Sequence, residues 1–599
     1  MNIRPETRRW LLAAALLVPL TVCHTWPLAT DPAHLSRNNN ADTLLNTWIV
    51  SWVAHQLPAN PRRLFDANIF HPEPNTLALS EPLILPGIAA IPLRAAGASP
   101  VLTYNLLLLA GFVLTGLGMF VFVSRLTGDP WAGLFAGALL AFNAHTLTRL
   151  PHLQAVFAPG LPLAFWALDR ILTGDRTRAA LLWLAAAMVS VALTSLYLTV
   201  FTALGLLVVW AVQTPWWWRQ ARPVVGRLLL AGAIAVPLML PVFIPYWHEY
   251  HDAGFERDLA DIMQFSGSLR MYATTAATLH YTVWSHTLFG TGSDTFFPGI
   301  AATAMALIGA VAAWRSPSRR WVVALIALGV VAVLLSLGPA TPVYRVLYQI
   351  LLPLGAIRGV ARFGVLFLFA VAVLAGLGLA GLRSRWPART AMPVTAVLLA
   401  LVTLEALHLP IPYARFEGIP RIYEVVAGLP DTGALAELPM YPSTAIFRNG
   451  AYVLASTVHW RPLVNGYSGF VPASYVQSAR ALRAFPTRRS LAFLERLGVR
   501  LLIVHPDRFA EPEARRILSR LMGEPWPQLE LIGIDEEGRR LYRLHPAAAG
   551  SVPGEGTDTP FGPESIRAIA PNVGGGRDGV GPPSIVPPDG MPRRAIAVR

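Results

Sequence analysis

Long apolar runs, separated by connections that contain arginine, dominate the chain from Trp10 to His408. The hydrocarbon core of a bilayer is about 30 Å thick, and a helix that crosses it needs about 20 mostly apolar residues. The pattern therefore predicts about eleven membrane-spanning helices. They are expected at Trp10–Trp26, Thr103–Val123, Trp131–Leu147, Ala155–Leu172, Ala179–Ser195, Tyr197–Val212, Val225–Trp247, Phe297–Trp314, Trp321–Leu337, Phe363–Leu382 and Ala391–His408.

The arginines predict how these helices are oriented. Cytoplasmic connections carry an excess of basic residues, and the first apolar run follows Arg4, Arg8 and Arg9. If that end is cytoplasmic, every second connection should be basic, and this is observed. Those connections contain Arg125, Arg170, Arg176, Arg178, Arg219, Arg222, Arg227, Arg315, Arg319, Arg320, Arg383, Arg385 and Arg389. We expect a multi-pass protein of the cell inner (plasma) membrane with a cytoplasmic N-terminus and an extracytoplasmic C-terminal domain.

The connections on the opposite side are the long ones. Within a membrane domain expected over residues 1–410, they cover residues 31–99, 248–296 and 338–362. Loops of this length without regular structure are uncommon in compact domains and usually carry function. We therefore expect the functional site on the extracytoplasmic side.

Two segments of the first outer loop have their own pattern. Leu44–Leu57 places Trp48 and Trp52 among apolar neighbours at helical spacing, which predicts a helix lying on the membrane surface. Leu77–Leu93 is apolar but interrupted by prolines, and the alternation of charge holds only if it does not cross the bilayer. We interpret Leu77–Leu93 as interfacial or re-entrant.

After His408 the pattern becomes that of a soluble α/β domain, expected over residues 411–546. Short apolar runs favour strands, and amphipathic stretches favour helices. The strands are expected at Ala434–Met440, Arg500–His505, Leu529–Ile534 and Leu541–Leu544, and the helices at Thr487–Leu497 and Pro512–Leu521. Residues 547–599 are rich in Gly and Pro without periodicity, which predicts a disordered tail. The expected fold class is a polytopic α-helical membrane protein with a C-terminal soluble α/β domain.

Composition supports a membrane protein and argues against an ordinary soluble enzyme. Hydrophobic residues make up 54% of the chain and charged residues 14%, whereas soluble domains carry about 25% charged residues. The net charge of +14 would suggest nucleic-acid binding in a soluble chain. Here lysine is absent and the arginines lie between apolar runs, which fits membrane topology and no nucleic-acid partner. The single Cys23 excludes an intrachain disulfide, and no Cys/His spacing resembles a zinc site.

Asp42 is the first candidate for chemistry. It follows three asparagines just beyond the first apolar run, at the start of the expected surface helix. One interpretation is an N-cap, because aspartate accepts hydrogen bonds from the free amides of the first helical turn. The other is a general base at the membrane boundary, which takes a proton from an acceptor hydroxyl. The two roles can coexist.

Polar side chains elsewhere on the outer side are candidate substrate-binding residues. Glu81 opens an apolar run, and ionisable groups at membrane depth are often functional, although a carboxylate at the water boundary is an equally good interpretation. His145, Arg149, His152 and Gln154 form a cluster between two apolar runs. This cluster could hold sugar hydroxyls or a phosphate, or could solvate a tight turn.

Arg358 and Arg362 depart from the positive-inside rule, because both lie on the expected outer side just before an apolar run. They are four positions apart, so a helix would place them on one face. Guanidinium groups are always charged and form paired hydrogen bonds with phosphate. The alternative interpretation is contact with anionic lipid headgroups.

Together these features resemble the GT-C glycosyltransferases, in particular the bacterial branch similar to protein O-mannosyltransferases and aminoarabinose transferases. The resemblance covers roughly residues 10–410. It rests on an N-in first span, an acid in the first outer loop, a surface helix, a polar cluster, an outer arginine pair and a C-terminal outer domain. The residues concerned are Asp42, Trp52, His55, His152, Gln154, Arg358 and Arg362.

The resemblance implies transfer of a sugar from a polyprenyl-phosphate carrier to an acceptor hydroxyl of a glycan, lipid or protein. By analogy, Asp42 acts as general base, and Arg358 and Arg362 bind the donor phosphate. No cofactor follows from the residues. A divalent metal stays open, because many members carry a second acid or a metal-binding pair, whereas residues 41 and 43 here are Ala and Thr.

Two other functions remain open from the sequence. One is a non-catalytic membrane protein that handles lipid-linked sugar or polysaccharide. The other is a transporter, which would favour charged residues near the middle of the bilayer; most ionisable groups here lie at the ends of apolar runs. The outer domain could bind the acceptor or only cover the site, and Val464–Tyr467 is a segment that could do either.

Overall fold

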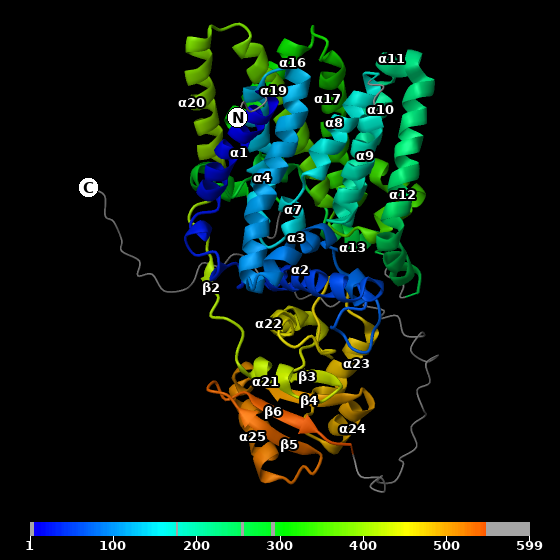
Figure 1. Cartoon of the computed structure of the whole chain (residues 1–599), viewed down its shortest axis with the longest axis vertical. Coiled ribbons are helices and arrows are strands. Elements are labelled where there is room, and N and C mark those ends of the chain that lie inside the picture. Colours follow the sequence, from blue (N-terminus) through cyan, green and yellow to red (C-terminus); the bar gives the residue numbers. More distant parts are fainter. Residues whose placement is uncertain (1–4, 175–177, 253–256, 289–293, 547–599) are drawn as a thin grey trace, which may run out of the picture.

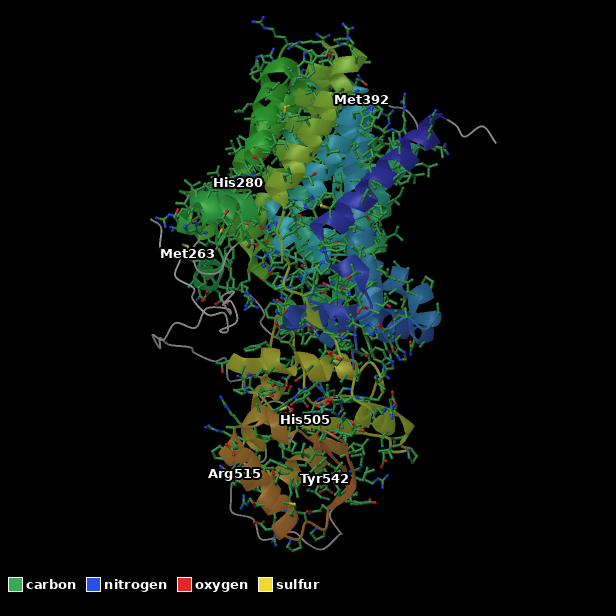
Figure 2. The ribbon with its side chains drawn as sticks, turned by 90° about the vertical axis from the view of Figure 1, so that its left-hand side faces the viewer. Met263, His280, Met392, His505, Arg515 and Tyr542 are labelled. Carbon is green, nitrogen blue, oxygen red and sulfur yellow. The ribbon has the colours of Figure 1, made fainter. Side chains whose placement is uncertain are left out.

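The computed structural model describes residues 5–174, 178–252, 257–288 and 294–546. The predicted tail at residues 547–599 lies outside the described residues, as do parts of the predicted outer loop 248–296. The molecule is elongated, with a bundle of long helices at one end and a smaller domain with a sheet at the other (Figure 1). Figure 2 shows Met392 near the far end of the bundle and Tyr542 in the sheet.

The bundle contains helices that lie in the predicted spans and further helices between them. The helices in the predicted spans are α1 (Pro5–His24), α4 (Pro100–Thr127), α5 (Pro130–Ala141), α8 (Gly160–Leu172), α9 (Arg178–Ala192), α10 (Leu196–Val212), α12 (Ala221–Asp252), α16 (Ile300–Ala313), α17 (Arg319–Ser336), α19 (Gly364–Arg383) and α20 (Ala388–Ala406). The others are α2 (Ala41–Ala59), α3 (Ile84–Ala95), α6 (Ala144–Thr148), α7 (Leu153–Val156), α11 (Thr214–Trp217), α13 (Leu259–Gln264), α14 (Thr278–His280), α15 (His286–Leu288) and α18 (Pro342–Ile350).

Each apolar run that predicts a membrane span is helical over most of its length within the described residues. In that part of the chain, six helices are long and apolar enough to cross a membrane. The helical membrane architecture is thus found, whereas the number of eleven spans stays a prediction. The six are Pro100–Thr127, Leu153–Leu172, Thr214–His251, Arg319–Ser336, Val360–Arg383 and Ala388–Ala406.

The run Trp131–Leu147 differs from the expectation of one continuous helix. Helix α5 ends at Ala141, and the Asn143 side chain accepts a hydrogen bond from the Thr146 amide at 2.9 Å, which starts α6. A helix as short as α5 is only about 18 Å long at 1.5 Å per residue. An asparagine cap inside an apolar run therefore divides this segment.

Helices α2 and α3 lie across the end of the bundle that faces the sheet domain (Figure 1). Helix α2 contains the predicted surface helix, but its apolar side chains are covered by protein: Trp48 and Trp52 are buried. It packs on α3 and α4 on one side and on α22 (Gly450–Ala455) on the other. The predicted helix is therefore present, and its tryptophans are covered by protein. Helix α3, which overlaps the predicted re-entrant segment Leu77–Leu93, is about 18 Å long and too short to cross a bilayer alone.

Residues 411–546 carry a four-stranded sheet in the order β3-β4-β6-β5. Strands β3 and β4 are parallel, and the other pairs are antiparallel. The strands are β3 (Ala434–Leu438), β4 (Val499–Val504), β5 (Leu529–Ile534) and β6 (Arg540–Leu544), and the remaining helices are α21 (Ile422–Gly428), α23 (Ala473–Leu482), α24 (Arg488–Arg496) and α25 (Glu511–Gly523). A two-stranded pairing of β1 (Leu35–Ser36) with β2 (Ala414–Arg415) ties the first outer loop to the start of this domain.

One hydrophobic core continues from the bundle into the sheet domain. It includes Trp48 and Val53 of α2, Val453 of α22 and Leu502 of β4. Gly450 makes this contact close, because a Cβ atom there would lie 3.3 Å from Leu44. The sheet domain is thus packed directly against the helix that begins at the Asp42 end.

At the opposite end of the bundle, the predicted cytoplasmic connections meet in ion pairs. The Asp169 carboxylate accepts from Arg125 at 2.9 Å and also binds Arg320. Arg383 donates to Asp129 at 2.6 Å. These connections therefore lie together at the end away from α2, as their alternation in the sequence requires.

Candidate active site at the interface of the bundle and the sheet domain

Asp42 lies in the first turn of α2, at the end of the bundle that faces the sheet domain. Asn40 caps this helix, because its side chain accepts a hydrogen bond from the Asp42 amide at 2.9 Å. The expectation that Asp42 is the N-cap is therefore wrong: the extended Asn40 takes that position. The Asp42 carboxylate can then make contacts outside its own helix.

Two side chains from distant parts of the chain hold this carboxylate. The Tyr467 hydroxyl donates to Asp42 Oδ1 at 2.6 Å, and His152 Nε2 lies 3.3 Å from Oδ2. One turn along α2, Asn46 donates to the carbonyl of Pro151 at 2.9 Å. This bond fixes the loop that carries His152 to the helix that carries Asp42. The site therefore joins α2, the loop before α7 and the sheet domain.

The surroundings of Asp42 favour its ionised form. Burial alone would raise the pKa, but hydrogen bonds from His152 and Tyr467 and the charge of Arg362 lower the pKa of Asp42 below its ordinary value. Burial lowers the pKa of His152 and outweighs the opposite effect of the Asp42 carboxylate. Since a carboxylate only accepts, the neutral His152 donates through Nε2. Its buried Nδ1 is then an acceptor with no partner among the described residues.

His152 also lines an open pocket beside Asp42. The walls come from the loop around α6 and α7, the N-terminal end of α10 and a 3₁₀ turn at Val360–Phe363. The empty space, counted out to solvent, is about 500 Å³. Gln154 Oε1 is buried in this pocket and has no partner in the part of the chain that the structure describes. The pocket therefore offers unfilled acceptors. Its polar side chains are Glu81, His145, Arg149, His152, Gln154, Ser195, Tyr197 and Arg362.

Glu81 reaches this pocket from the first outer loop. Its carboxylate accepts from the Leu196 amide at 2.8 Å and from the Ser195 hydroxyl at 3.2 Å, at the N-terminal end of α10. Burial raises the pKa of Glu81 to about 7, against these hydrogen bonds and the charge of Arg362. Glu81 is therefore a half-buried group on the pocket wall, held by the N-terminal end of α10.

Arg358 and Arg362 do not share a helix face. Gly359 has a non-helical backbone, and the 3₁₀ turn begins only at Val360. The Arg362 guanidinium lies over the Tyr197 ring at 5.4 Å and lines the pocket, whereas Arg358 lies over Phe265 at 4.2 Å and is not among the pocket residues. The expected pair is thus divided. Arg362 acts electrostatically on Asp42, and Arg358 acts on Tyr467.

Sequence reasoning missed Tyr197 and Asp294. The Tyr197 hydroxyl accepts from the Arg358 amide at 3.1 Å, so one tyrosine organises both arginines. Asp294 binds Arg149 and lies 3.3 Å from His145 Nδ1, which ties the loop before α16 to the pocket wall. No signal short of a three-dimensional contact joins Asp294 to residues about 150 positions earlier.

The described residues hold no group of three His, Cys, Asp or Glu side chains arranged for a metal ion. Asp42 and His152 contact each other, and the next carboxylates, Glu81 and Asp294, are bonded to α10 and to Arg149. This donor set does not fit a dedicated divalent-metal site, which requires several oxygen ligands converging on one point. We therefore derive no step through a metal.

No family model and no curated protein matches the chain. Among solved structures, it resembles the arabinofuranosyltransferase AftD from Mycobacteria with a TM-score of 0.54 at 16% identity, over 90% of this chain and 41% of that chain. For ArnT from Cupriavidus metallidurans, bound to undecaprenyl phosphate, the TM-score is 0.48 at 13% identity, over 89% of this chain and 97% of ArnT. For the oligosaccharyltransferase of Archaeoglobus fulgidus, in complex with Zn and sulfate, the TM-score is 0.49 at 14% identity, over 90% of this chain and 73% of that chain.

The chain spans about two fifths of AftD, and at these identities the likeness shows the fold alone. AftD is a GT-C glycosyltransferase, and the architecture of this chain is the GT-C fold.

Proposed function

We propose that this chain is a membrane glycosyltransferase that moves a sugar from a polyprenyl-phosphate carrier to an acceptor hydroxyl on the extracytoplasmic face, with Asp42 as general base. The fold supports a transferase of this class, but a fold hosts more than one function. The observation that carries the proposal is local. An ionised Asp42, in contact with His152, lies beside a pocket whose wall also holds Arg362.

The pocket suits a sugar phosphate. Among the described residues, the Arg362 guanidinium has no carboxylate partner in an ion pair, so it can bind an incoming phosphate by paired, charge-assisted hydrogen bonds. His152 Nδ1 and Gln154 Oε1 are acceptors without partners, and sugar hydroxyls are donors that would satisfy them. Arg358 lies outside the pocket, and we assign it to the acceptor side, near Tyr467.

The chemistry follows from these positions. Asp42 takes the proton of the acceptor hydroxyl while the acceptor oxygen attacks the anomeric carbon. The bond between that carbon and the phosphate oxygen breaks, and its electron pair leaves with the phosphate. Arg362 compensates the charge that develops there. Attack from the face opposite the phosphate inverts the anomeric centre. The acceptor hydroxyl can reach Asp42 because each carboxylate oxygen has two lone pairs and each is engaged only once here.

The test is an assay of purified protein with a panel of undecaprenyl-phosphate sugars, which measures released undecaprenyl phosphate in the presence of envelope glycans and lipids. We expect release with at least one donor, and loss of at least about 100-fold in Asp42→Asn. Asp31→Asn is the matched control, since Asp31 lies in the same outer loop and, among the described residues, its carboxylate contacts His34 and Arg415. Full transfer in Asp42→Asn would reject the assignment of the base. Lipid binding without release from any donor would favour a non-catalytic handler of lipid-linked sugar.

A further inference from the structure

The segment that carries Tyr467 forms backbone hydrogen bonds with residues 68–71 of the first outer loop, as two neighbouring strands would. The Leu463 amide donates to the Asn68 carbonyl at 2.9 Å, and the His71 amide donates to the Leu463 carbonyl at 2.9 Å. The Phe70 amide donates to the Asn465 carbonyl at 3.1 Å. Three backbone hydrogen bonds therefore fix the register of the sheet domain against the outer loop.

Side chains tighten this junction. A Cβ atom on Gly466 would lie 2.4 Å from the Phe70 ring, so only glycine allows this approach. The Asn68 side chain donates to the Arg461 carbonyl at 3.1 Å and accepts from Trp48 Nε1 of α2 at 3.2 Å. The outer loop thus connects the Tyr467 segment to the same helix that carries Asp42.

Asn465 anchors the segment within the sheet domain. Its side chain accepts from the Glu437 amide at 2.8 Å and donates to the Glu437 carbonyl at 2.9 Å. Glu437 belongs to β3, which is buried along its whole length. Tyr467 is therefore held two residues beyond a rigid attachment to the sheet, and its position relative to Asp42 is set by the docking of the whole domain.

The contact made by Tyr467 differs from an ion pair. Its hydroxyl is a neutral donor, so it orients the Asp42 carboxylate at Oδ1 without cancelling its charge. Among the described residues, Oδ2 has the longer contact to His152 at 3.3 Å. An oriented but still charged carboxylate is what proton abstraction needs.

We propose that Tyr467 is a positioning residue for the Asp42 carboxylate, so that the sheet domain completes the catalytic site by docking on the first outer loop. The inference rests on the proposed function for the role of Asp42 as base. It gives the sheet domain a task beyond covering the site: without the docked domain, the carboxylate lacks the donor that fixes its orientation.

The first test needs no turnover. Labelling of Asp42 by a water-soluble carbodiimide and an amine, measured by peptide mass spectrometry at pH 5, reports how readily the carboxylate is protonated and reached. We expect about tenfold faster labelling of Asp42 in Tyr467→Phe, because the carboxylate loses a hydrogen bond that stabilises its charged form. Asp31 in the same loop is the internal reference, and its rate should not change.

Tyr475→Phe is the matched control. Tyr475 belongs to the same domain, and its buried hydroxyl donates to the Tyr441 carbonyl at 2.6 Å and accepts from Asn449, so its loss removes comparable hydrogen bonds that do not involve Asp42. It should lower the melting temperature without accelerating Asp42 labelling. Equal labelling of Asp42 in wild type and Tyr467→Phe would overturn the positioning role, as would the same acceleration in Tyr475→Phe.

The second test uses transfer activity. Tyr467→Phe should lower kcat about tenfold with little change in donor KM, and should move the acid limb of the pH profile upward. In an Asp42→Asn background, Tyr467→Phe should have no further effect, whereas a merely structural role would give additive losses. The labelling assay does not depend on transfer. If the chain had no transferase activity, the proposed function would be overturned, and the labelling of Asp42 would still decide whether Tyr467 positions it.

Discussion

Two carboxylates at opposite ends of the bundle are held in contrasting ways. Asp169 is 3% exposed and accepts from two guanidinium groups, those of Arg125 and Arg320, and from Trp321 Nε1 at 2.8 Å. Asp42 is 36% exposed and contacts a phenol and a neutral imidazole. The nearby guanidinium of Arg362 is not paired with it and instead lines the pocket.

The difference separates a structural carboxylate from a reactive one. The Asp169 carboxylate is paired with guanidinium groups and both of its oxygens accept hydrogen bonds, so it joins α4, α8 and α17. Neither the carboxylate nor its arginines are available to a ligand. At Asp42 the charge is retained, the oxygens keep lone pairs, and the cation stays available for an anion. Acids of both kinds lie at helix ends in the sequence, and only their partners distinguish them.

The largest effect is expected on transfer in Asp42→Asn. Removal of a general base costs about 10²–10⁴-fold in rate, while the amide keeps the shape and the hydrogen bond from Tyr467. We therefore expect near-complete loss of transfer with a melting temperature close to wild type. Initial rates with the best donor, and a thermal melt of the same sample, test this. A rate within threefold of wild type would contradict the role of Asp42.

Asp169→Asn should show the reverse. Removing one partner of a buried charge pair costs about 3–5 kcal/mol, because the other charges stay buried and unpaired. We expect a clear drop in melting temperature and in the yield of folded protein, with normal kcat for the molecules that fold. If Asp169→Asn abolished transfer at unchanged stability, the contrast between the two acids would fail.

Arg362→Gln should have a smaller effect that falls on donor binding. Loss of the phosphate ligand should raise donor KM by about 10–100-fold, which corresponds to one charge-assisted hydrogen-bonding group. Arg63→Gln is the control, since Arg63 is an exposed arginine of the first outer loop, outside the pocket. Donor titrations of both variants provide the measurement, and an unchanged KM in Arg362→Gln would place the phosphate elsewhere.

The smallest effect concerns pH. Because burial raises the pKa of Glu81 to about 7, its carboxyl group is neutral below that pH and charged above it. The charged form competes with the donor phosphate for Arg362, so donor KM should rise a few-fold as pH passes through 7.

Glu81 should also affect folding stability. Its pKa in the folded protein exceeds the unfolded value of 4.5, so the free energy of unfolding falls as pH rises between those two values. In Glu81→Gln both dependences should disappear, and a persistent rise in KM would assign them to another group.

Much of the scaffold could be predicted from the sequence. Hydropathy locates the helical segments and the four strands, because burial in lipid or in a core requires apolar residues at a fixed period. The sequence also indicated His152 and Asp42 as candidates. It could not indicate that they touch, since this contact depends on Asn46 bonding the Pro151 carbonyl across more than a hundred residues.

Other features of the site could not be predicted for the same reason. Tyr467 is 425 positions from Asp42, and nothing in its local sequence shows which carboxylate it binds. Asn40 rather than Asp42 caps α2, because the chain is extended at Asn40 and enters the helix directly after it, which three asparagines in a row do not reveal. Arg358 and Arg362 are separated by the backbone at Gly359, which local spacing does not show. Predictions failed where tertiary contacts select among residues of similar propensity.

The most direct measurement is a structure of the protein with undecaprenyl phosphate bound. We expect the phosphate in the pocket beside His152, with oxygens about 2.8 Å from the Arg362 guanidinium, and with the space for the sugar between it and Asp42. A phosphate bound at the Asp169 end of the bundle, or on the outer side with Arg362 unengaged and Asp42 out of reach of one sugar ring, would contradict a shared site for the acid and the arginine.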